Sequence, residues 1–545
     1  MILPVDLRAR RRRLAVRAAA CALCAAAPLE IVRAQAARAG EGGAPSVELA
    51  QGALAGAVRD GVEDFLGIPY AAPPLGELRF APPAAPEGWE GVRDASAHGS
   101  PCPQGFGLDA DRTTDEDCLF VNVQRPVGTD AEAALPVLVL IHGGGLVTGS
   151  GNNEDLDALV EENGIVGVTM NYRLSTLGNL ALPEGGGAVA NWGLRDQQAA
   201  LRWVRDNIAD FGGDPERVTV GGESAGGFST CAQLAAPSSD GLFSAAFMMS
   251  TYCYAMPLAE AREVTAELVE ELGCPSAPDE ALACLRDRPV DAFLDAQASI
   301  RRASAGTEFL PRSPYDALVA GELADVPLMI GWTRDEGRSF QTDWSTTSAN
   351  TYDEGEYRDY VAETFGEHAP AILKAYPWPD DPTRYTGTYL VADLAIQNVV
   401  TSGPAGLSPC KSLDMTERLA GAGPVWSYEF AHSDASGWFD VPGYVWGAGH
   451  ATELPYLIPN RGNKALNAGA FGEDERTLAT EMRARWGAFV RTGRPDGDGL
   501  AEWPEYAAED GPILSFEGGD DSHLVPAWAV REAHECALWE RVLGG

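Results

Sequence analysis

Arg217-Val-Thr-Val-Gly-Gly-Glu-Ser-Ala-Gly226 is the stretch that decides the fold of this 545-residue chain. Its first residues, Arg217 to Val220, are typical of a buried strand, and Gly227 to Leu234 behind it is compatible with a helix. The pentapeptide Gly222 to Gly226 matches G-x-S-x-G, in which small residues let a strand turn abruptly into a helix with the serine exposed. A plain glycine turn explains the pentapeptide alone equally well. Its strand and helix context favours Ser224 as a nucleophile.

Apolar runs alternate with helical patterns on both sides of this turn. We predict buried strands at Leu135–Ile141 and Ile165–Tyr172, and a helix at Asp196–Phe211. Strands return at Val326–Ile330 and Val425–Phe430, after a helical, acidic stretch. Strand, helix and strand in this order form the unit of a parallel sheet. We therefore expect an α/β fold with one large, mostly parallel central sheet, flanked by helices and carrying helical insertions.

A run of glycines follows the first of these strands. His142-Gly-Gly-Gly145 comes directly after Ile141, and consecutive glycines let backbone N–H groups face a developing oxyanion without interference from side chains. Together with the N–H group of Ala225, the N–H groups of this run would supply three donors. Taken alone, the run is also compatible with a flexible turn.

A nucleophilic serine needs a base and an orienting acid, which follow it in this fold type in the order acid, then histidine. Five of the seven histidines lie beyond Ser224: His368, His432, His450, His523 and His534. His450 stands in a small-residue loop, Gly447 to Glu453, where a base can reach a pocket; a solvated or core histidine is the common alternative. The neighbours Asp335 and Glu336 follow a predicted strand, and either carboxylate suits the acid.

The charge balance excludes one class of partner. The 40 Lys and Arg residues against 79 Asp and Glu give a net charge of −39, so no basic stripe remains to follow nucleic-acid phosphates. Beyond the N-terminus no segment is apolar enough for stable insertion in a membrane. A surface this acidic suits an enzyme that stays soluble, and we hypothesise tolerance of raised salt.

The N-terminal segment is predicted to be a signal peptide covering residues 1–36. Six arginines between Arg8 and Arg17 precede an apolar stretch from Ala18 to Leu29 and the small-residue site Ala34-Gln-Ala36. A disordered basic tail is the alternative. Cleavage after Ala36 leaves 33 basic and 77 acidic residues, a charge of −44. A signal peptide predicts a secreted or periplasmic protein. We expect the remaining residues, 37–545, to form one domain.

Several long motifs, in register, closely resemble the type-B carboxylesterase family of α/β-hydrolases. They are Phe65-Leu-Gly-Ile-Pro-Tyr-Ala71, Glu116-Asp-Cys-Leu-Phe-Val-Asn-Val123, Phe211 to Gly226, Asp335-Glu-Gly337 and Cys536-Ala-Leu-Trp539. The resemblance runs from about Val47 to the C-terminus. It implies ester hydrolysis through an acyl-enzyme, with no cofactor and no metal. It also implies these roles: Ser224 as nucleophile, Glu336 as acid, His450 as base, and Gly144, Gly145 and Ala225 as oxyanion donors.

The resemblance leaves open which bond is cleaved. Relatives include lipases, so a lipase or a polyester or amide hydrolase is an alternative, and the family also has non-catalytic interaction proteins that have lost the serine. The family's aromatic residue after the glycine run is Leu146 here, and its Gly-Phe-Leu reads Gly178-Asn-Leu180. Substrate preference therefore cannot be transferred beyond a small-molecule ester. The oligomeric state cannot be read from the sequence.

Eight cysteines remain after removal of the signal segment, and an even number in an exported protein favours disulfides. Without a CxxC pair, zinc is a poor alternative. The family resemblance implies the pairs Cys102–Cys118 and Cys274–Cys284, with Cys410–Cys536 as a third. Cys231 and Cys253 remain, and we infer that they pair with each other; two buried free thiols are the alternative.

Overall fold

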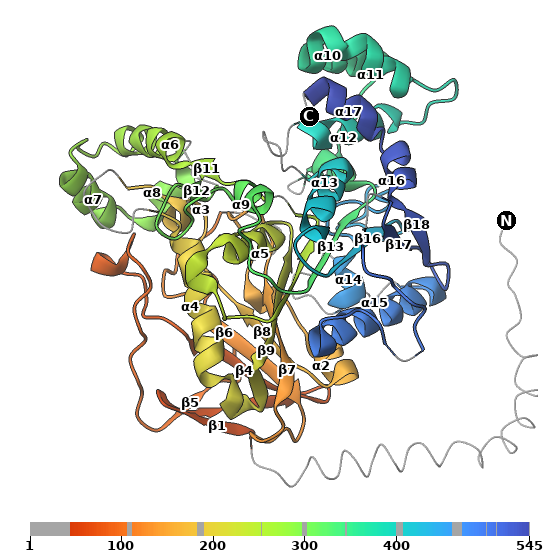
Figure 1. Ribbon diagram of the computed structural model, residues 1–545. Coiled ribbons are helices and arrows are strands. Elements are labelled where there is room, and N and C mark those ends of the chain that lie inside the picture. The colour runs from red at the N-terminus through yellow and green to blue at the C-terminus, as the bar shows by residue number, and fades with distance from the viewer. Residues whose placement is uncertain are drawn as a thin grey trace, which may run out of the picture. The chain divides into compact units, whose positions relative to one another are not determined.

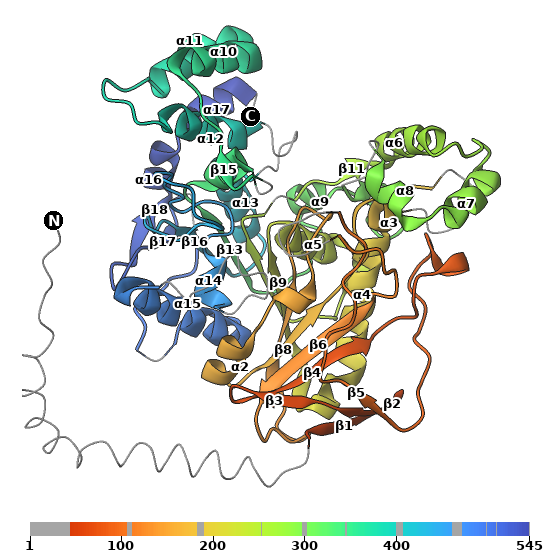
Figure 2. The same ribbon diagram turned by 180° about the vertical axis from the view of Figure 1, so that it is seen from behind.

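An eleven-stranded sheet forms the centre of the computed structural model, in the order β18-β17-β16-β13-β10-β9-β7-β8-β6-β4-β3 (Figures 1 and 2). In chain order its strands are β3 (Ala57–Arg59), β4 (Val62–Pro69), β6 (Phe120–Pro126), β7 (Leu135–Ile141), β8 (Val166–Met170), β9 (Gly213–Glu223), β10 (Ala245–Met249), β13 (Leu328–Thr333), β16 (Val425–Phe430), β17 (Pro512–Phe516) and β18 (His523–Pro526). Every neighbouring pair from β17 through to β8 is parallel, and antiparallel strands flank this block. The expected mostly parallel sheet is confirmed.

The structure describes residues 44–543 except 106–111, 183–189, 252, 297–301, 344–345, 399–406, 460–470, 498 and 508–509. The predicted signal segment, residues 1–36, lies outside the described residues. Residues from Ser46 onward form one compact unit. None of the described helices is both long enough and apolar enough to cross a membrane.

Helices cover both faces of the sheet. Strand β7 shows why: it is apolar at every position and sends alternate side chains to opposite faces, so both faces must be covered. Val137, Val139 and Ile141 join a core shared with α4 (Trp192–Asn207) and α5 (Ala225–Ala235). Leu138 and Leu140 join the other core, with α2 (Asp157–Asn163) and α15 (Glu473–Thr492) (Figure 1). The sheet is therefore packed between two layers of helices, which support the parallel strands from both faces.

Two groups of helices extend from the sheet and pack around small cores of their own. The first is the expected helical, acidic insertion, α6 (Leu258–Glu271), α7 (Pro278–Asp287) and α8 (Val290–Asp295). The second comprises α10 (Glu354–Phe365), α11 (Ala369–Ala375), α12 (Thr386–Asn398) and α17 (Cys536–Leu543). The shorter or more peripheral elements are β1 (Ser46–Leu49), β2 (Gly52–Ala55), β5 (Val92–Asp94), β11 (Met256–Pro257), β12 (Ser304–Ala305), β14 (Thr342–Asp343), β15 (Ser348–Ala349), α3 (Ser175–Asn179), α9 (Pro314–Ala320), α13 (Pro409–Ala420), α14 (Leu454–Leu457) and α16 (Ala527–Ala533).

Some predicted bounds differ from the observed ones. Helix α4 begins at Trp192, four residues before the expected start, because Asn191 adopts a left-handed conformation and ends the preceding loop there. The strand expected at Val326–Ile330 begins instead at Leu328, since Pro327 has no N–H group to donate to a neighbouring strand. The strand expected at Arg217–Val220 extends over Gly213–Glu223 and leads directly into Ser224.

Four disulfides connect the eight cysteines in the pairs expected from the sequence: Cys102–Cys118, Cys231–Cys253, Cys274–Cys284 and Cys410–Cys536. Cys231 lies on α5, the helix behind Ser224, so its disulfide ties that helix to the segment after β10. The Cys410–Cys536 bond joins α13 to α17 across 126 residues of chain.

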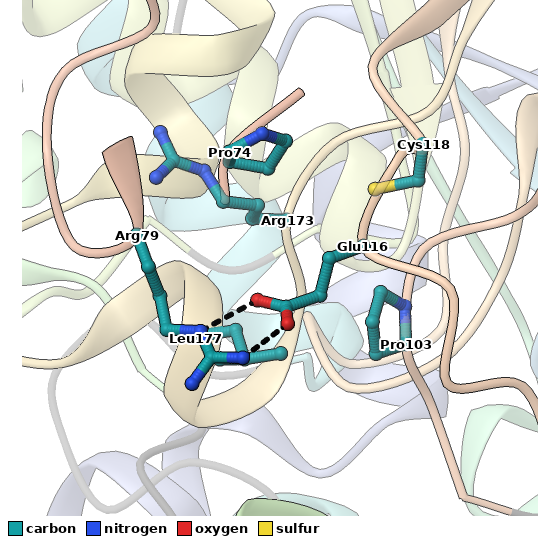
Figure 3. A pocket seen from close by; sticks show the side chains of 7 residues that line it. All are labelled: Pro74, Arg79, Pro103, Glu116, Cys118, Arg173 and Leu177. Atoms are coloured by element: carbon teal, nitrogen blue, oxygen red, sulfur yellow. Dashed lines mark hydrogen bonds and ion pairs between the residues drawn. The ribbon is translucent and has the colours of Figure 1, made fainter. Parts of the chain in front are cut away.

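Arg79 forms a buried ion pair with Glu116 (Figure 3) and also ties the first insertion to the body of the protein. Arg79 and Glu116 make a two-pronged contact in which Nε of Arg79 donates to the Glu116 carboxylate at 2.8 Å. The same guanidinium donates to the backbone carbonyls of Arg286 and Arg288, at 2.9 and 2.6 Å. One arginine therefore joins Glu116, two residues from the Cys102–Cys118 disulfide, to the end of α7.

Candidate active site

Ser224 stands at the turn between β9 and α5, in a backbone conformation that L-residues rarely adopt (φ 56°, ψ −118°). The turn is possible because its flanking residues are small. A Cβ atom on Gly222 would lie 2.8 Å from Cα of Gly226, and one on Gly226 would collide with the carbonyl of Ile141. The turn that the G-x-S-x-G pattern predicts is present, with the serine at the point where the parallel strands end.

His450 links Ser224 to Glu336 through its two ring nitrogens. Its Nε2 lies 2.9 Å from Oγ of Ser224, and its Nδ1 lies 2.6 Å from Oε2 of Glu336. Glu336 is 1% exposed, and its other carboxylate oxygen accepts the N–H of Thr333 at 3.0 Å. The structure therefore brings together the three residues singled out in the sequence, from the loops after β9, β13 and β16.

The carbonyl of His450 is held as well as its ring. Oγ of Ser339 donates to this carbonyl at 2.9 Å, and Nε1 of Trp438 donates to it at 3.2 Å. The N–H group of His450 donates to the carbonyl of Glu336 at 3.3 Å. These contacts fix the imidazole from its backbone, so its orientation does not depend on the ring contacts alone.

The other histidines beyond Ser224 have different partners. His534 lies 2.7 Å from Glu429, His432 lies 4.0 Å from Glu475, and His523 is exposed with its Nδ1 near a backbone carbonyl. His368 ends a short 3₁₀ turn before α11. Among the five candidates, His450 alone is brought to Ser224.

Asp335, the alternative acid, points away from the imidazole. Its carboxylate accepts the N–H of Ala448 at 3.0 Å and pairs with Arg334 and Arg338. Glu336 is therefore the neighbour that reaches His450.

The glycine run lies against the serine. Gly144 and Gly145 adopt positive φ angles of 103° and 65°, and a Cβ atom on Gly143 would lie 3.4 Å from Cβ of Ser224. Ala225 begins helix α5, where the first N–H groups have no partner within the helix. The glycine run and the start of α5 therefore both lie beside Ser224.

Two further buried glutamates, to which no motif assigned a role, complete the surroundings of His450. Oε1 of Glu223 lies 3.2 Å from Nε2 of His450, and Glu453 is fully buried. Burial disfavours the imidazolium, but the carboxylates of Glu223, Glu336 and Glu453 outweigh it and raise the pKa of His450 to about 9. Burial, and then the Glu223 and Glu336 carboxylates, raises the pKa of Glu453 well above its usual range. The signal available in the sequence was their position: Glu223 is next to Ser224, and Glu453 is three residues after His450.

No three His, Cys, Asp or Glu side chains in the described part of the chain are arranged to hold a metal ion.

Comparison with known proteins gives the family. The carboxylesterase family model matches residues 43–539. The chain belongs to the carboxylesterase family. It is 34% identical over 491 residues to para-nitrobenzyl esterase of Bacillus subtilis, covering 86% of this chain and 93% of that protein. It is also 32% identical over 509 residues to human cocaine esterase, covering 89% of this chain and 88% of the relative.

The fold agrees with this assignment. A solved structure of a PNB esterase superposes with a TM-score of 0.72 at 30% identity, covering 90% of this carboxylesterase and all of that chain. Another relative is the fumonisin B1 esterase of Sphingopyxis macrogoltabida, 34% identical over 491 residues, covering 85% of each protein. The relatives are named as esterases or hydrolases, and the chain is a carboxylic ester hydrolase with an α/β-hydrolase fold.

Proposed function

We propose that this carboxylesterase is an exported serine hydrolase that cleaves small-molecule carboxylic esters through an acyl-enzyme, with Ser224, His450 and Glu336 as its catalytic residues. The observation that carries the proposal is the hydrogen-bonded series from Ser224 through both ring nitrogens of His450 to Glu336. Such a series is the arrangement that converts a weakly nucleophilic hydroxyl into an attacking oxygen.

In the first half-reaction, Oγ of Ser224 attacks the ester carbonyl carbon while Nε2 of His450 accepts the hydroxyl proton. Glu336 stabilises the imidazolium through its contact with Nδ1 and keeps the ring in the required tautomer. The carbonyl oxygen becomes an oxyanion, which the N–H groups of Gly144, Gly145 and Ala225 stabilise. The tetrahedral intermediate then collapses, His450 returns the proton to the leaving oxygen, and the alcohol departs.

In the second half-reaction, water attacks the acyl group on Ser224. His450 accepts a proton from this water, the same backbone donors stabilise the second oxyanion, and the proton is returned to Oγ of Ser224 as the acid is released. The cycle balances with the ester and one water consumed, and with the acid and the alcohol formed. The chemistry draws only on side-chain and backbone groups of this chain.

Export is the second part of the proposal. It is supported by the order of charged, apolar and small-residue segments in residues 1–36 and by the four disulfides, which persist in oxidising compartments. Expression of the full chain, followed by mass spectrometry of the exported protein, tests it. We expect the mature N-terminus at Ala37; an uncut chain retained in the cytoplasm would contradict export.

Hydrolysis of p-nitrophenyl esters of increasing acyl length tests the reaction, with Ser224→Ala measured beside the wild type. The variant should lose most of a rate advantage of about a millionfold while its melting temperature stays unchanged. Ser348→Ala, which removes an exposed hydroxyl on β15, is the matched control and should behave as the wild type.

The same series separates the alternatives. A folded wild type that released no nitrophenol at any acyl length would favour the non-catalytic class. A maximum at long acyl chains with activity on triglyceride emulsions would favour a lipase, and cleavage of the matching anilides would extend the substrate class to amides.

A further inference from the structure

The loop that carries His450 is attached to the loop that carries Glu336, and Asp335 makes much of the attachment. We call residues Gly447–His450 the histidine loop. The N–H of Asp335 donates to the carbonyl of Ala448 at 2.8 Å, and Oδ2 of Asp335 accepts the N–H of Ala448 at 3.0 Å. Asp335 thus holds both backbone groups of Ala448, two residues before His450.

The Asp335 carboxylate is itself held on both oxygens. Oδ1 lies 3.0 Å from the guanidinium of Arg338, and Oδ2 lies 3.2 Å from that of Arg334. The side chain of Arg338 also stacks over the ring of Tyr389, with 4.8 Å from the guanidinium carbon to the ring centroid. Because the two arginines fix the position of the Asp335 carboxylate, its hydrogen bond with the N–H of Ala448 has a defined direction.

The histidine loop fits closely against this group. Gly447 adopts a positive φ of 55°, and a Cβ atom there would lie 2.6 Å from Oδ2 of Asp335 and 2.5 Å from Arg338. The loop therefore approaches Asp335 at a distance that only glycine allows at this position.

On the side away from the histidine loop, Asp335 borders a cavity. A cavity of about 180 Å³ lies behind the loop that carries Asp335 and Glu336, with Asp335, Glu336, Asp393, Gln397 and His534 in its wall. Burial, more than any other influence, raises the pKa of Asp393 to about 6. On the cavity side no packed side chains of the described residues hold the Asp335 carboxylate. Its position is therefore determined by its ion pairs and by its hydrogen bond with Ala448.

We propose that Asp335 is a positioning residue that holds the histidine loop, and through it the imidazole of His450, in line with Glu336 and Ser224. The inference rests on the proposed triad and adds to it the residue that aligns two of its members. Asp335 touches no reacting atom; it acts through the N–H of Ala448. Loss of this acceptor lets the loop move, and a shift of the imidazole by about 1 Å costs about a hundredfold in rate.

Three variants test the role. Asp335→Ala removes the acceptor and the charge, Asp335→Asn removes the charge and keeps an oxygen that can accept from Ala448, and Asp393→Asn removes a charge from the same cavity without touching the loop. Hydrolysis of p-nitrophenyl butyrate gives kcat and KM, normalised to active sites titrated with a p-nitrophenyl phosphonate, so that unfolded protein is not counted.

We expect kcat of Asp335→Ala to fall about a hundredfold with KM within about threefold of wild type, and Asp335→Asn to retain kcat within about tenfold. Asp393→Asn should match the wild type. The pH profile separates alignment from charge. In Asp335→Ala the midpoint of the acid limb should move down further than in Asp335→Asn, since only the alanine variant frees His450 from the carboxylate of Glu336.

Each contrary result has a definite meaning. Equal losses in Asp335→Ala and Asp335→Asn, with equal pH profiles, would show that only the charge matters and overturn the positioning role. A wild-type kcat in Asp335→Ala, with Ser224→Ala inactive, would overturn this role and leave the proposed function intact. Activity remaining in Ser224→Ala would overturn the triad and this role together.

Discussion

Glu223, the residue immediately before Ser224, brings a carboxylate oxygen to 3.2 Å from Nε2 of His450, the nitrogen that also faces the serine hydroxyl. Nδ1 on the opposite side of the ring contacts Glu336, so the imidazole lies between two carboxylates. A buried ring in this position holds a proton more tightly than an ordinary histidine.

The first prediction concerns pH. The pKa of His450 is raised to about 9, and the imidazole must be neutral to accept the serine proton, so kcat/KM should rise with pH through a midpoint near 9. Glu223→Gln removes a negative charge that stabilises the imidazolium, and the midpoint should move down toward the ordinary histidine value. Profiles with p-nitrophenyl acetate, corrected for spontaneous hydrolysis, measure both. An unchanged midpoint in Glu223→Gln would contradict the electrostatic explanation.

The second prediction concerns the glycine run. A Cβ atom on Gly144 would collide with the backbone carbonyl of Thr148, whereas one on Gly145 would meet only a methyl group of Val147, at 3.7 Å. Gly144→Ala should therefore displace the backbone donors and lower kcat by about a hundredfold to a thousandfold. Gly145→Ala also has a positive φ, in the left-handed region that L-residues can occupy, and lacks the collision, so it serves as the comparison variant and should have the smaller effect. Equal effects of the two substitutions would contradict the collision with Thr148 as the cause of the loss.

The third prediction concerns disulfides. Replacing Cys410 and Cys536 together by alanine opens a 126-residue loop and should cost about 5 kcal/mol of unfolding free energy. The corresponding replacement of Cys231 and Cys253 opens a 22-residue loop and should cost about 3 kcal/mol. Urea unfolding followed by tryptophan fluorescence gives both values. The reverse order would indicate that local packing around α5 outweighs loop entropy.

The fourth prediction concerns Asp157 at the start of α2. The amide of Gln124 faces the carboxylates of Asp64, Asp155 and Asp157, and burial together with Asp155 and Asp64 raises the pKa of Asp157 to about 8. The raised pKa of Asp157 contributes to the free energy of unfolding. This contribution is complete below the pKa of about 4 that Asp157 has in the unfolded chain, and it is lost as the pH rises through about 8.

Asp157→Asn imitates the protonated carboxyl, so it should stabilise the protein at pH 9 by about 1–3 kcal/mol and change little at pH 4. Urea unfolding at the two pH values measures the difference. Glu161→Gln, in the same helix and without this cluster, is the control. A gain of the same size at both pH values would rule out the ionisation of Asp157 as its source.

The local motif predicted the sharp turn at Ser224 because the geometry of such a turn depends on the residues of the turn itself. The sheet followed from apolar runs that only buried parallel strands accommodate. The ends of α4 and β13 could not be read from periodicity, since one start depends on the conformation of Asn191 and the other on Pro327.

The remaining members of the site needed three-dimensional information. Asp335 and Glu336 are adjacent acids in one loop, and only the direction of each side chain separates them: one meets Ala448 and the other meets His450. Glu223 and Glu453 lie close in sequence to Ser224 and His450, but their effect on His450 is electrostatic and depends on how near their buried carboxylates come to the ring, which the sequence does not encode locally.

The parallel order of β9, β13 and β16 gives the site a property of its own. Ser224 lies 112 residues before Glu336, and Glu336 lies 114 residues before His450, yet the strands that precede them are close neighbours in the sheet, with β10 between β9 and β13. A chain cut between Ser224 and Glu336 therefore yields two pieces, neither of which holds a complete site, and turnover returns only when the pieces reassemble the sheet. Ester hydrolysis would then serve as a direct reporter of fragment complementation.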